Sequence, residues 1–188
     1  YEAAATGGTA RLVGSPKRGT WSGLTVGGTR EPVLVANYES ATEPPEVVRL
    51  DARGGEHRRL TAFAVERAAA LDLAPVENFW FDNARGQRVH SMLVKPPKFD
   101  PAKKYPLVVF PHGGPHNMTK DQFFVRWNYH LLTSPGYVLL MTNYTGSTGF
   151  GEEFAAAIHQ DVLRGPASEI EQAADAAIRE FPFIDGSR

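Results

Sequence analysis

Two uninterrupted apolar runs constrain the fold of this chain more than any other feature. Residues 105–110 read YPLVVF and residues 137–142 read YVLLMT. A strand that is apolar at every position is typical of a parallel sheet with both faces covered. Neither run approaches the ~20 apolar residues that cross a bilayer, so no membrane segment is expected. The runs therefore predict two doubly buried strands of an α/β sheet.

Two helices are predicted around these strands, at Asp121–Leu132 and Ser168–Phe181. Ser168 and Glu171 match the pattern of an N-terminal capping box. Apolar residues of the second helix recur at helical spacing; they are Ile170, Ala173, Ala174, Ala177, Ile178 and Phe181. The order strand, helix, strand, helix predicts an α/β domain over residues 76–188. A pair of strands at residues 76–81 and 89–94 is predicted at the start of this domain.

The first 62 residues carry a different pattern of short β-prone runs. These runs are residues 20–26, 32–38 and 46–50, and they are separated by Gly27-Gly28, Glu43-Pro44-Pro45 and Gly54-Gly55. Such spacing predicts an antiparallel meander, either one propeller blade or part of a sandwich. A few strands of this kind bury too little apolar area to be stable alone, so this half is expected to need more protein. Residues 63–75 are interpreted as a linker with one helical turn.

Composition excludes several classes of function. The formal net charge is −1 and the chain contains no cysteine. A near-neutral chain is not steered to nucleic acid or to an anionic membrane, and disulfides, thiolate metal sites and a cysteine nucleophile are excluded. His112 and His116 have metal-ligand spacing, but they lie in a glycine-rich loop without the glutamate of a zinc protease. We therefore predict neither a metal nor a cofactor. The compartment, cytoplasm or periplasm, and homo-oligomer formation stay open.

A glycine loop directly follows the first apolar run. Residues 110–115 read FPHGGP. Glycines allow a tight bend and let bare backbone amides approach a ligand. Amides at a strand-to-helix loop suit the negative charge that develops during acyl transfer, and a His-Gly-Gly loop has this role in α/β-hydrolases. The alternative is a glycine turn that only closes a strand.

A second glycine-rich segment, residues 143–151 (NYTGSTGFG), follows the other apolar run. Its G-x-x-G-x-G spacing differs from dinucleotide-binding and phosphate-binding loops, so nucleotide binding is not predicted. A role in shaping a cleft and a flexible connection remain as alternatives.

Together these segments resemble the prolyl oligopeptidase family of serine peptidases, in its acylaminoacyl-peptidase and dipeptidyl-peptidase branch. The hydrolase-like motifs are residues 104–109 (KYPLVV), 112–115 (HGGP) and 143–151, and the propeller-like motifs are residues 47–50, 54–56 and 59–61. The resemblance implies that residues 1–62 end a β-propeller and that residues 76–188 form the N-terminal half of an α/β-hydrolase domain. It also implies hydrolysis of short peptides or acyl-peptides.

The resemblance also assigns roles to residues. Gly114 would offer its N–H to the oxyanion, Gly113 would allow the close approach, and His112 would brace the loop. Asn143 and Tyr144 would line the floor of the substrate site. Thr145 stands where the family commonly has arginine, so a contact made by that arginine is not expected from this position.

The chain contains no Gly-x-Ser-x-Gly nucleophile motif. On the hydrolase order, the Ser/Asp/His triad would follow residue 188, and this segment alone would be inactive. We expect it to be ordered only with its partner, the remainder of the same enzyme, because a half-sheet leaves an edge and an apolar face exposed. Two alternatives stay open, a carboxylesterase or lipase and a non-catalytic binding module of hydrolase shape.

Overall fold

The computed structural model describes residues 3–4, 6–12, 14, 16–51 and 57–187. The chain divides into two compact units. Residues 1–71 and 121–123 make up the first unit, and residues 72–120 and 124–188 make up the second. The turn expected at Gly54-Gly55, like the propeller-like residues 54–56, lies outside the described residues.

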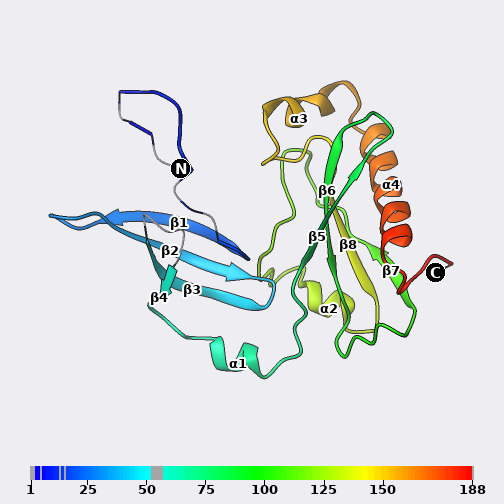
Figure 1. Ribbon diagram of the computed structural model, residues 1–188, viewed down its shortest axis with the longest axis horizontal. Helices are drawn as coiled ribbons and strands as arrows, with labels where there is room; N and C mark the ends of the chain where they lie inside the picture. The colour runs from blue at the N-terminus through cyan, green and yellow to red at the C-terminus, as the bar shows by residue number, and fades with distance from the viewer. Residues whose placement is uncertain (1–2, 5, 13, 15, 52–56, 188) are drawn as a thin grey trace. The chain divides into compact units, whose positions relative to one another are not determined.

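An antiparallel sheet in the order β1-β2-β3-β4 forms the first unit (Figure 1). Its strands are β1 (Thr20–Gly27), β2 (Val33–Ser40), β3 (Glu43–Leu50) and β4 (His57–Arg59). Ala36, Tyr38 and Val48 form its buried cluster, with Trp21 and Leu50 packed against them. A single-turn helix, α1 (Val65–Ala69), follows the sheet. The antiparallel meander and the single helical turn are confirmed.

The expectation that residues 43–45 separate two strands is wrong, because they open β3. The pairing register between β2 and β3 shifts between Tyr38 and Ser40, and neither Pro44 nor Pro45 has a registered partner. Proline is tolerated at such an irregularity because its missing N–H is not needed by the ladder.

A mixed sheet in the order β5-β6-β8-β7-β9 forms the second unit. Its strands are β5 (Glu77–Asp82), β6 (Arg88–Val94), β7 (Tyr105–Val109), β8 (Val138–Asn143) and β9 (Ile184–Asp185). β5, β6 and β8 pair antiparallel, whereas β8, β7 and β9 pair parallel. The predicted α/β layering is confirmed.

The two apolar runs differ in burial. Every residue of β8 is buried, as predicted, because β8 lies between β6 and β7 in the sheet. Every residue of β7 is only half-buried. β9 pairs with β7 at Tyr105 and Pro106 alone, so little of that edge is covered. Double burial is confirmed for β8 and is wrong for β7 within the described residues.

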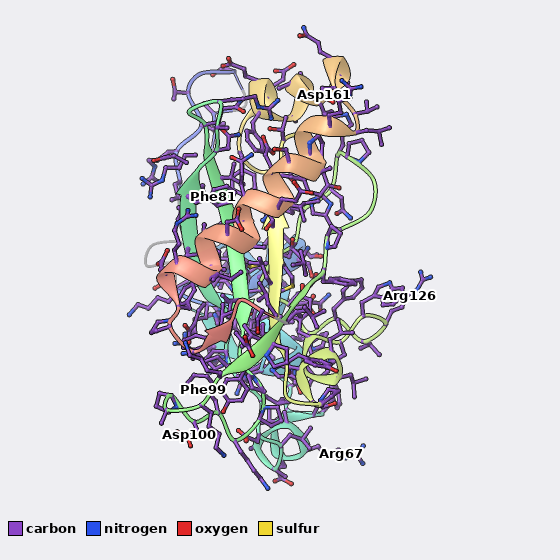
Figure 2. All side chains as sticks on the ribbon, turned by 90° about the vertical axis from the view of Figure 1, so that its right-hand side faces the viewer. Arg67, Phe81, Phe99, Asp100, Arg126 and Asp161 are labelled. Atoms are coloured by element: carbon purple, nitrogen blue, oxygen red, sulfur yellow. The ribbon has the colours of Figure 1, made fainter. Side chains whose placement is uncertain are left out.

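Helix α4 (Arg164–Glu180) lies across the sheet of the second unit (Figure 2). Its buried Ala173, Ala176 and Ala177 pack against a cluster that includes Phe79, Phe81, Val89, Leu93, Val138 and Leu140. Small residues on the helix let it approach the larger side chains of the strands, as close packing requires.

The capping box predicted at Ser168 and Glu171 is wrong, because α4 begins one turn earlier. The Asp161 carboxylate accepts hydrogen bonds from the backbone N–H groups of Arg164 (2.9 Å) and Gly165 (2.7 Å). Ser168 lies inside the helix, where its hydroxyl contacts Gln172 Nε2 at 2.9 Å.

The helix predicted at Asp121–Leu132 is also mostly absent. Only α2 (Tyr129–Thr133) forms, and the Asn128 side chain caps it. Residues 121–123 belong instead to the first unit, where the Asp121 carboxylate accepts from the N–H groups of Gly19 (2.8 Å) and Ala41 (2.7 Å). These long-range hydrogen bonds fix the segment in a non-helical conformation.

Two short helices connect β8 to α4. They are α3 (Glu152–Ala156) and the 3₁₀ turn η1 (Ala157–Gln160). No helix in the described parts of the chain has the length and apolar character to cross a membrane.

The cap assignment predicts unequal effects of two substitutions in the full-length protein. Asp161→Ala should destabilise α4 by about 1 kcal/mol, because it leaves two N-terminal amides without their acceptor. Ser168→Ala should change stability by less than half of that, since alanine is a good interior helix residue. Hydrogen–deuterium exchange over residues 162–172 measures both, and equal protection loss in the two variants would contradict the assignment.

Candidate functional site

The sheet brings the two glycine-rich segments together. β7 and β8 are parallel neighbours, so the chain leaves both strands at the same edge of the sheet. Thr148 N donates to Asn117 O at 2.9 Å, and His116 Nδ1 lies 3.2 Å from Gly146 O. The His-Gly-Gly-Pro loop (residues 112–115) is therefore tied to the turn of residues 144–148, hereafter the 144–148 turn.

His112 is the main side-chain link between loop and turn. Its ring is buried and stacks on the Tyr144 ring, with centroids 4.5 Å apart and planes 15° apart. Its Nε2 lies 2.8 Å from Ser147 Oγ, and its Nδ1 lies 3.4 Å from Gly113 O. With the proton on Nδ1, the ring donates to this carbonyl and accepts from the Ser147 hydroxyl. Ser147 is fully buried, so its hydroxyl serves the loop and is not an exposed nucleophile.

The two carbonyl groups of the bend are held by the protein. Tyr144 Oη donates to His112 O at 2.7 Å, and Asn117 Nδ2 donates to Gly113 O at 3.4 Å. A trans peptide points its C=O and N–H in opposite directions. Anchoring these carbonyls therefore turns the N–H groups of Gly113 and Gly114 away from the groups that hold the loop.

These two N–H groups are available to a ligand. Gly113 and Gly114 are exposed, and no hydrogen bond among the described residues uses either N–H. Gly114 has φ +66°, and a Cβ there would meet no atom within 4 Å. Glycine is thus favoured at this position by backbone conformation and not by lack of space.

Asn143 and Tyr144 lie behind the loop. Asn143 is fully buried, and its Oδ1 accepts from Thr119 N at 2.8 Å. Its Nδ2 donates to Thr119 O (3.0 Å) and to His90 Nδ1 (2.9 Å), so both amide hydrogens are used within the chain. Burial raises the pKa of Tyr144, whose hydroxyl is the donor to His112 O. In the structure both side chains therefore bond to the backbone around the loop.

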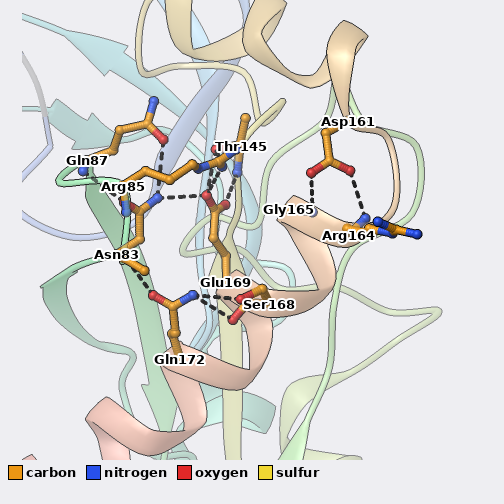
Figure 3. A network of polar contacts seen from close by, with 11 residues as sticks. Asn83, Arg85, Gln87, Thr145, Asp161, Arg164, Gly165, Ser168, Glu169 and Gln172 are labelled. Carbon is orange, nitrogen blue, oxygen red and sulfur yellow. Dashed lines mark hydrogen bonds and ion pairs between the residues drawn. The ribbon is translucent and has the colours of Figure 1, made fainter.

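Sequence reasoning missed a buried polar network beside the 144–148 turn (Figure 3). Glu169 of α4 is only 1% exposed and contacts Asn83, Arg85 and Thr145. One signal was present in the sequence. Glu169 falls on the same helical face as Ala173 and Ala176, where an acidic residue requires buried partners.

Metal ligation finds no support in the described part of the chain. No group of three or more histidine and acidic residues there is placed to hold an ion. His116 and His159 contact each other edge to face, with ring centroids 5.5 Å apart.

The chain is similar to known proteins in both sequence and fold. A match to the prolyl oligopeptidase family covers residues 123–188, which follow the His-Gly-Gly-Pro loop. Dipeptidyl-peptidase 5 of Porphyromonas gingivalis is 32% identical over 162 residues, and that of Schizosaccharomyces pombe is 32% identical over 124 residues. Over these residues the chain is similar to members of the prolyl oligopeptidase family. The acylaminoacyl peptidase of Pyrococcus horikoshii superposes on 90% of the chain with a TM-score of 0.75 at 26% identity.

The chain accounts for only part of each family member that it matches. The P. gingivalis alignment covers 85% of this chain and 23% of the relative, and the S. pombe alignment covers 66% and 18%. The superposition with the P. horikoshii enzyme covers 26% of that chain.

Two histidines, the buried His112 and the half-buried His90, predict a pH dependence of stability. Burial lowers the pKa of His112 and of His90, so the folded state favours their neutral forms. The unfolded state, where histidine has a pKa of about 6.5, binds more protons below that pH. Stability of the second unit should therefore fall as the pH drops through 6.5 towards the lower folded values.

Thermal denaturation of the full-length protein between pH 7.5 and 5.5 measures this effect. His112→Gln should flatten the decline, because it removes one of the two histidines whose pKa is lowered by burial. A midpoint of His112→Gln that follows pH as steeply as that of the unsubstituted protein would contradict the assignment.

Proposed function

We propose that this chain belongs to a serine-type hydrolase of short peptides or acyl-peptides and provides its oxyanion loop. The observation that carries the proposal is the pair of exposed residues Gly113 and Gly114, whose backbone N–H groups make no hydrogen bond among the described residues. Their carbonyl partners are anchored by Tyr144 and Asn117, so the amides are fixed in direction before any substrate binds. Preorganised donors of this kind stabilise charge without reorganisation during the reaction.

The proposed reaction is acyl transfer through a serine nucleophile. A serine would attack the substrate carbonyl while a histidine removes its proton, and the carbonyl oxygen would gain negative charge. Gly114 N–H would donate to that oxygen, with Gly113 allowing the approach and His112 bracing the loop. Asn143 and Tyr144 would hold the floor beneath it. We place the Ser/Asp/His triad in the remainder of the enzyme, because this chain lacks the Gly-x-Ser-x-Gly motif.

The substrate class follows from two kinds of relative. Proteins similar to this chain are named dipeptidyl-peptidase 5 and acylaminoacyl peptidase, which supports short peptides and acyl-peptides. The strands of the first unit support a propeller ahead of the hydrolase domain, a part that simple esterases lack.

Labelling the full-length protein with a fluorophosphonate probe tests the hydrolase assignment. We expect covalent labelling, and faster hydrolysis of dipeptide and acyl-peptide p-nitroanilides than of short acyl esters. Preference for the esters would favour a carboxylesterase. Absence of labelling in folded protein would favour a non-catalytic module and overturn the proposal.

The role of Gly114 predicts a specific loss of turnover. Gly114→Ala strains the bend at φ +66° and should move the amide, lowering kcat about 10²–10³-fold, as loss of one oxyanion donor does. Gly136→Ala is the matched control, because Gly136 also has positive φ and open space but lies in the turn before β8. Steady-state kinetics of the full-length variants compare the two, and unchanged kcat in Gly114→Ala would remove Gly114 from the site.

A further inference from the structure

We propose that Glu169 and Arg85 are positioning residues that set the orientation of the His-Gly-Gly-Pro loop through the 144–148 turn. The inference rests on the proposed function for its consequence in catalysis. The structural coupling itself is independent of that function.

Glu169 is a buried carboxylate whose two oxygens are both used. Oε2 accepts from the backbone N–H of Thr145 at 2.6 Å. Oε1 accepts from Thr145 Oγ1 at 2.8 Å and from Asn83 Nδ2 at 2.7 Å, and it also pairs with Arg85 Nη2. A helix residue of the second unit thus binds the backbone and side chain of the same turn residue (Figure 3).

Arg85 completes the clamp from the turn between β5 and β6. Its Nη2 donates to Thr145 Oγ1 at 2.8 Å as well as to Glu169. A Cβ at Gly165 would lie 3.1 Å from Arg85 Nη1, so the guanidinium lies close to the first turn of α4. Thr145 carries no charge. The positive charge beside the Glu169 carboxylate therefore comes from Arg85, which is 84 positions earlier in the sequence.

The clamp is connected to the loop through consecutive residues. Thr145 is held by Glu169, and its neighbour Tyr144 donates to His112 O at 2.7 Å. On the other side, Ser147 Oγ lies 2.8 Å from His112 Nε2, and Ser147 N donates back to Tyr144 O at 2.9 Å. A shift at Thr145 would move both groups that hold His112. The His112 Nδ1 atom lies 3.4 Å from Gly113 O, so the shift would also reach the peptide that carries the Gly114 N–H.

The chemistry of the clamp requires a carboxylate. In Glu169→Gln, an amide NH₂ replaces one acceptor oxygen. If it faces Thr145 N, two donors oppose each other and the turn loses its anchor. If it faces the other way, it meets the donors of Asn83, Arg85 and Thr145 instead. Either orientation leaves a buried donor unsatisfied although the side chain has almost the same shape.

Two substitutions serve as matched controls. Glu46 is buried at 3% exposure and accepts from Ala64 N at 2.8 Å, but it lies in the first unit. Arg164 lines the same cavity of about 210 Å³ as Arg85 and Glu169. Among the described residues, no hydrogen bond or ion pair joins the Arg164 side chain to Glu169. Glu46→Gln tests the general effect of this replacement, and Arg164→Met tests loss of a charge beside the cavity.

The experiment measures kcat and KM per fluorophosphonate-titrated site, together with hydrogen–deuterium exchange over residues 110–118, in the full-length protein. Glu169→Gln and Arg85→Met should each lower kcat on the order of tenfold to hundredfold, as small misplacement of a catalytic group does, with KM within about twofold. Exchange over residues 110–118 should rise in both variants. Glu46→Gln and Arg164→Met should change neither quantity.

Titration separates positioning from stability. A structural role alone would lower the number of titratable sites and leave kcat per site unchanged, which would overturn the inference. If the unsubstituted protein is neither labelled nor active, the proposed function fails. Exchange over residues 110–118 then decides the coupling, and unchanged exchange in Glu169→Gln would overturn it.

Discussion

The site depends on one constraint, the anchoring of two carbonyl groups at the bend of residues 112–114. A peptide plane has two polar ends, and the protein holds one end so that the other is presented to solvent. Tyr144 holds His112 O, while the His112 ring and Asn117 approach Gly113 O. The anchors belong to segments that the parallel pairing of β7 and β8 brings to one edge. The orientation of the two peptide groups therefore depends on contacts from several residues that the fold brings together.

This constraint explains why the surrounding polar groups are so fully used. Asn143 ties residue 119 to the end of β8, and Glu169 ties residue 145 to α4. Among the described residues, no buried side-chain nitrogen or oxygen lacks a hydrogen-bond partner. A buried polar network in which every group is hydrogen-bonded is rigid, because breaking one contact leaves a buried polar group without a partner and costs free energy. The network therefore holds the His-Gly-Gly-Pro loop and the 144–148 turn in one arrangement.

Much of the fold was predictable because the strands are defined locally. The apolar run of β8, the hairpin-length turn between β5 and β6, and the meander of the first unit follow from residue type and spacing alone. The two glycine-rich segments meet because the neighbouring parallel strands β7 and β8 end at the same edge of the sheet. The hydrogen bonds from Tyr144 to His112 O and from Asn117 to Gly113 O could not be predicted, because they depend on where the fold places these side chains.

The predictions failed where a distant partner decides the local structure. Asp121 leaves a helical pattern because Gly19 and Ala41 donate to its carboxylate. Ser168 and Glu171 match a capping box, yet Asp161 caps the helix one turn earlier. The clamp of Arg85 and Glu169 joins residues 84 positions apart, so no window of sequence contains it.

A crystal structure of the full-length protein with a phosphonate bonded to its active serine would test the central claim most directly. We predict that the phosphonyl oxygen lies about 2.7–3.1 Å from Gly114 N, the distance of a donor aimed at an oxyanion. A phosphonyl oxygen bound by other groups, with the Gly114 amide facing away from it, would contradict the account.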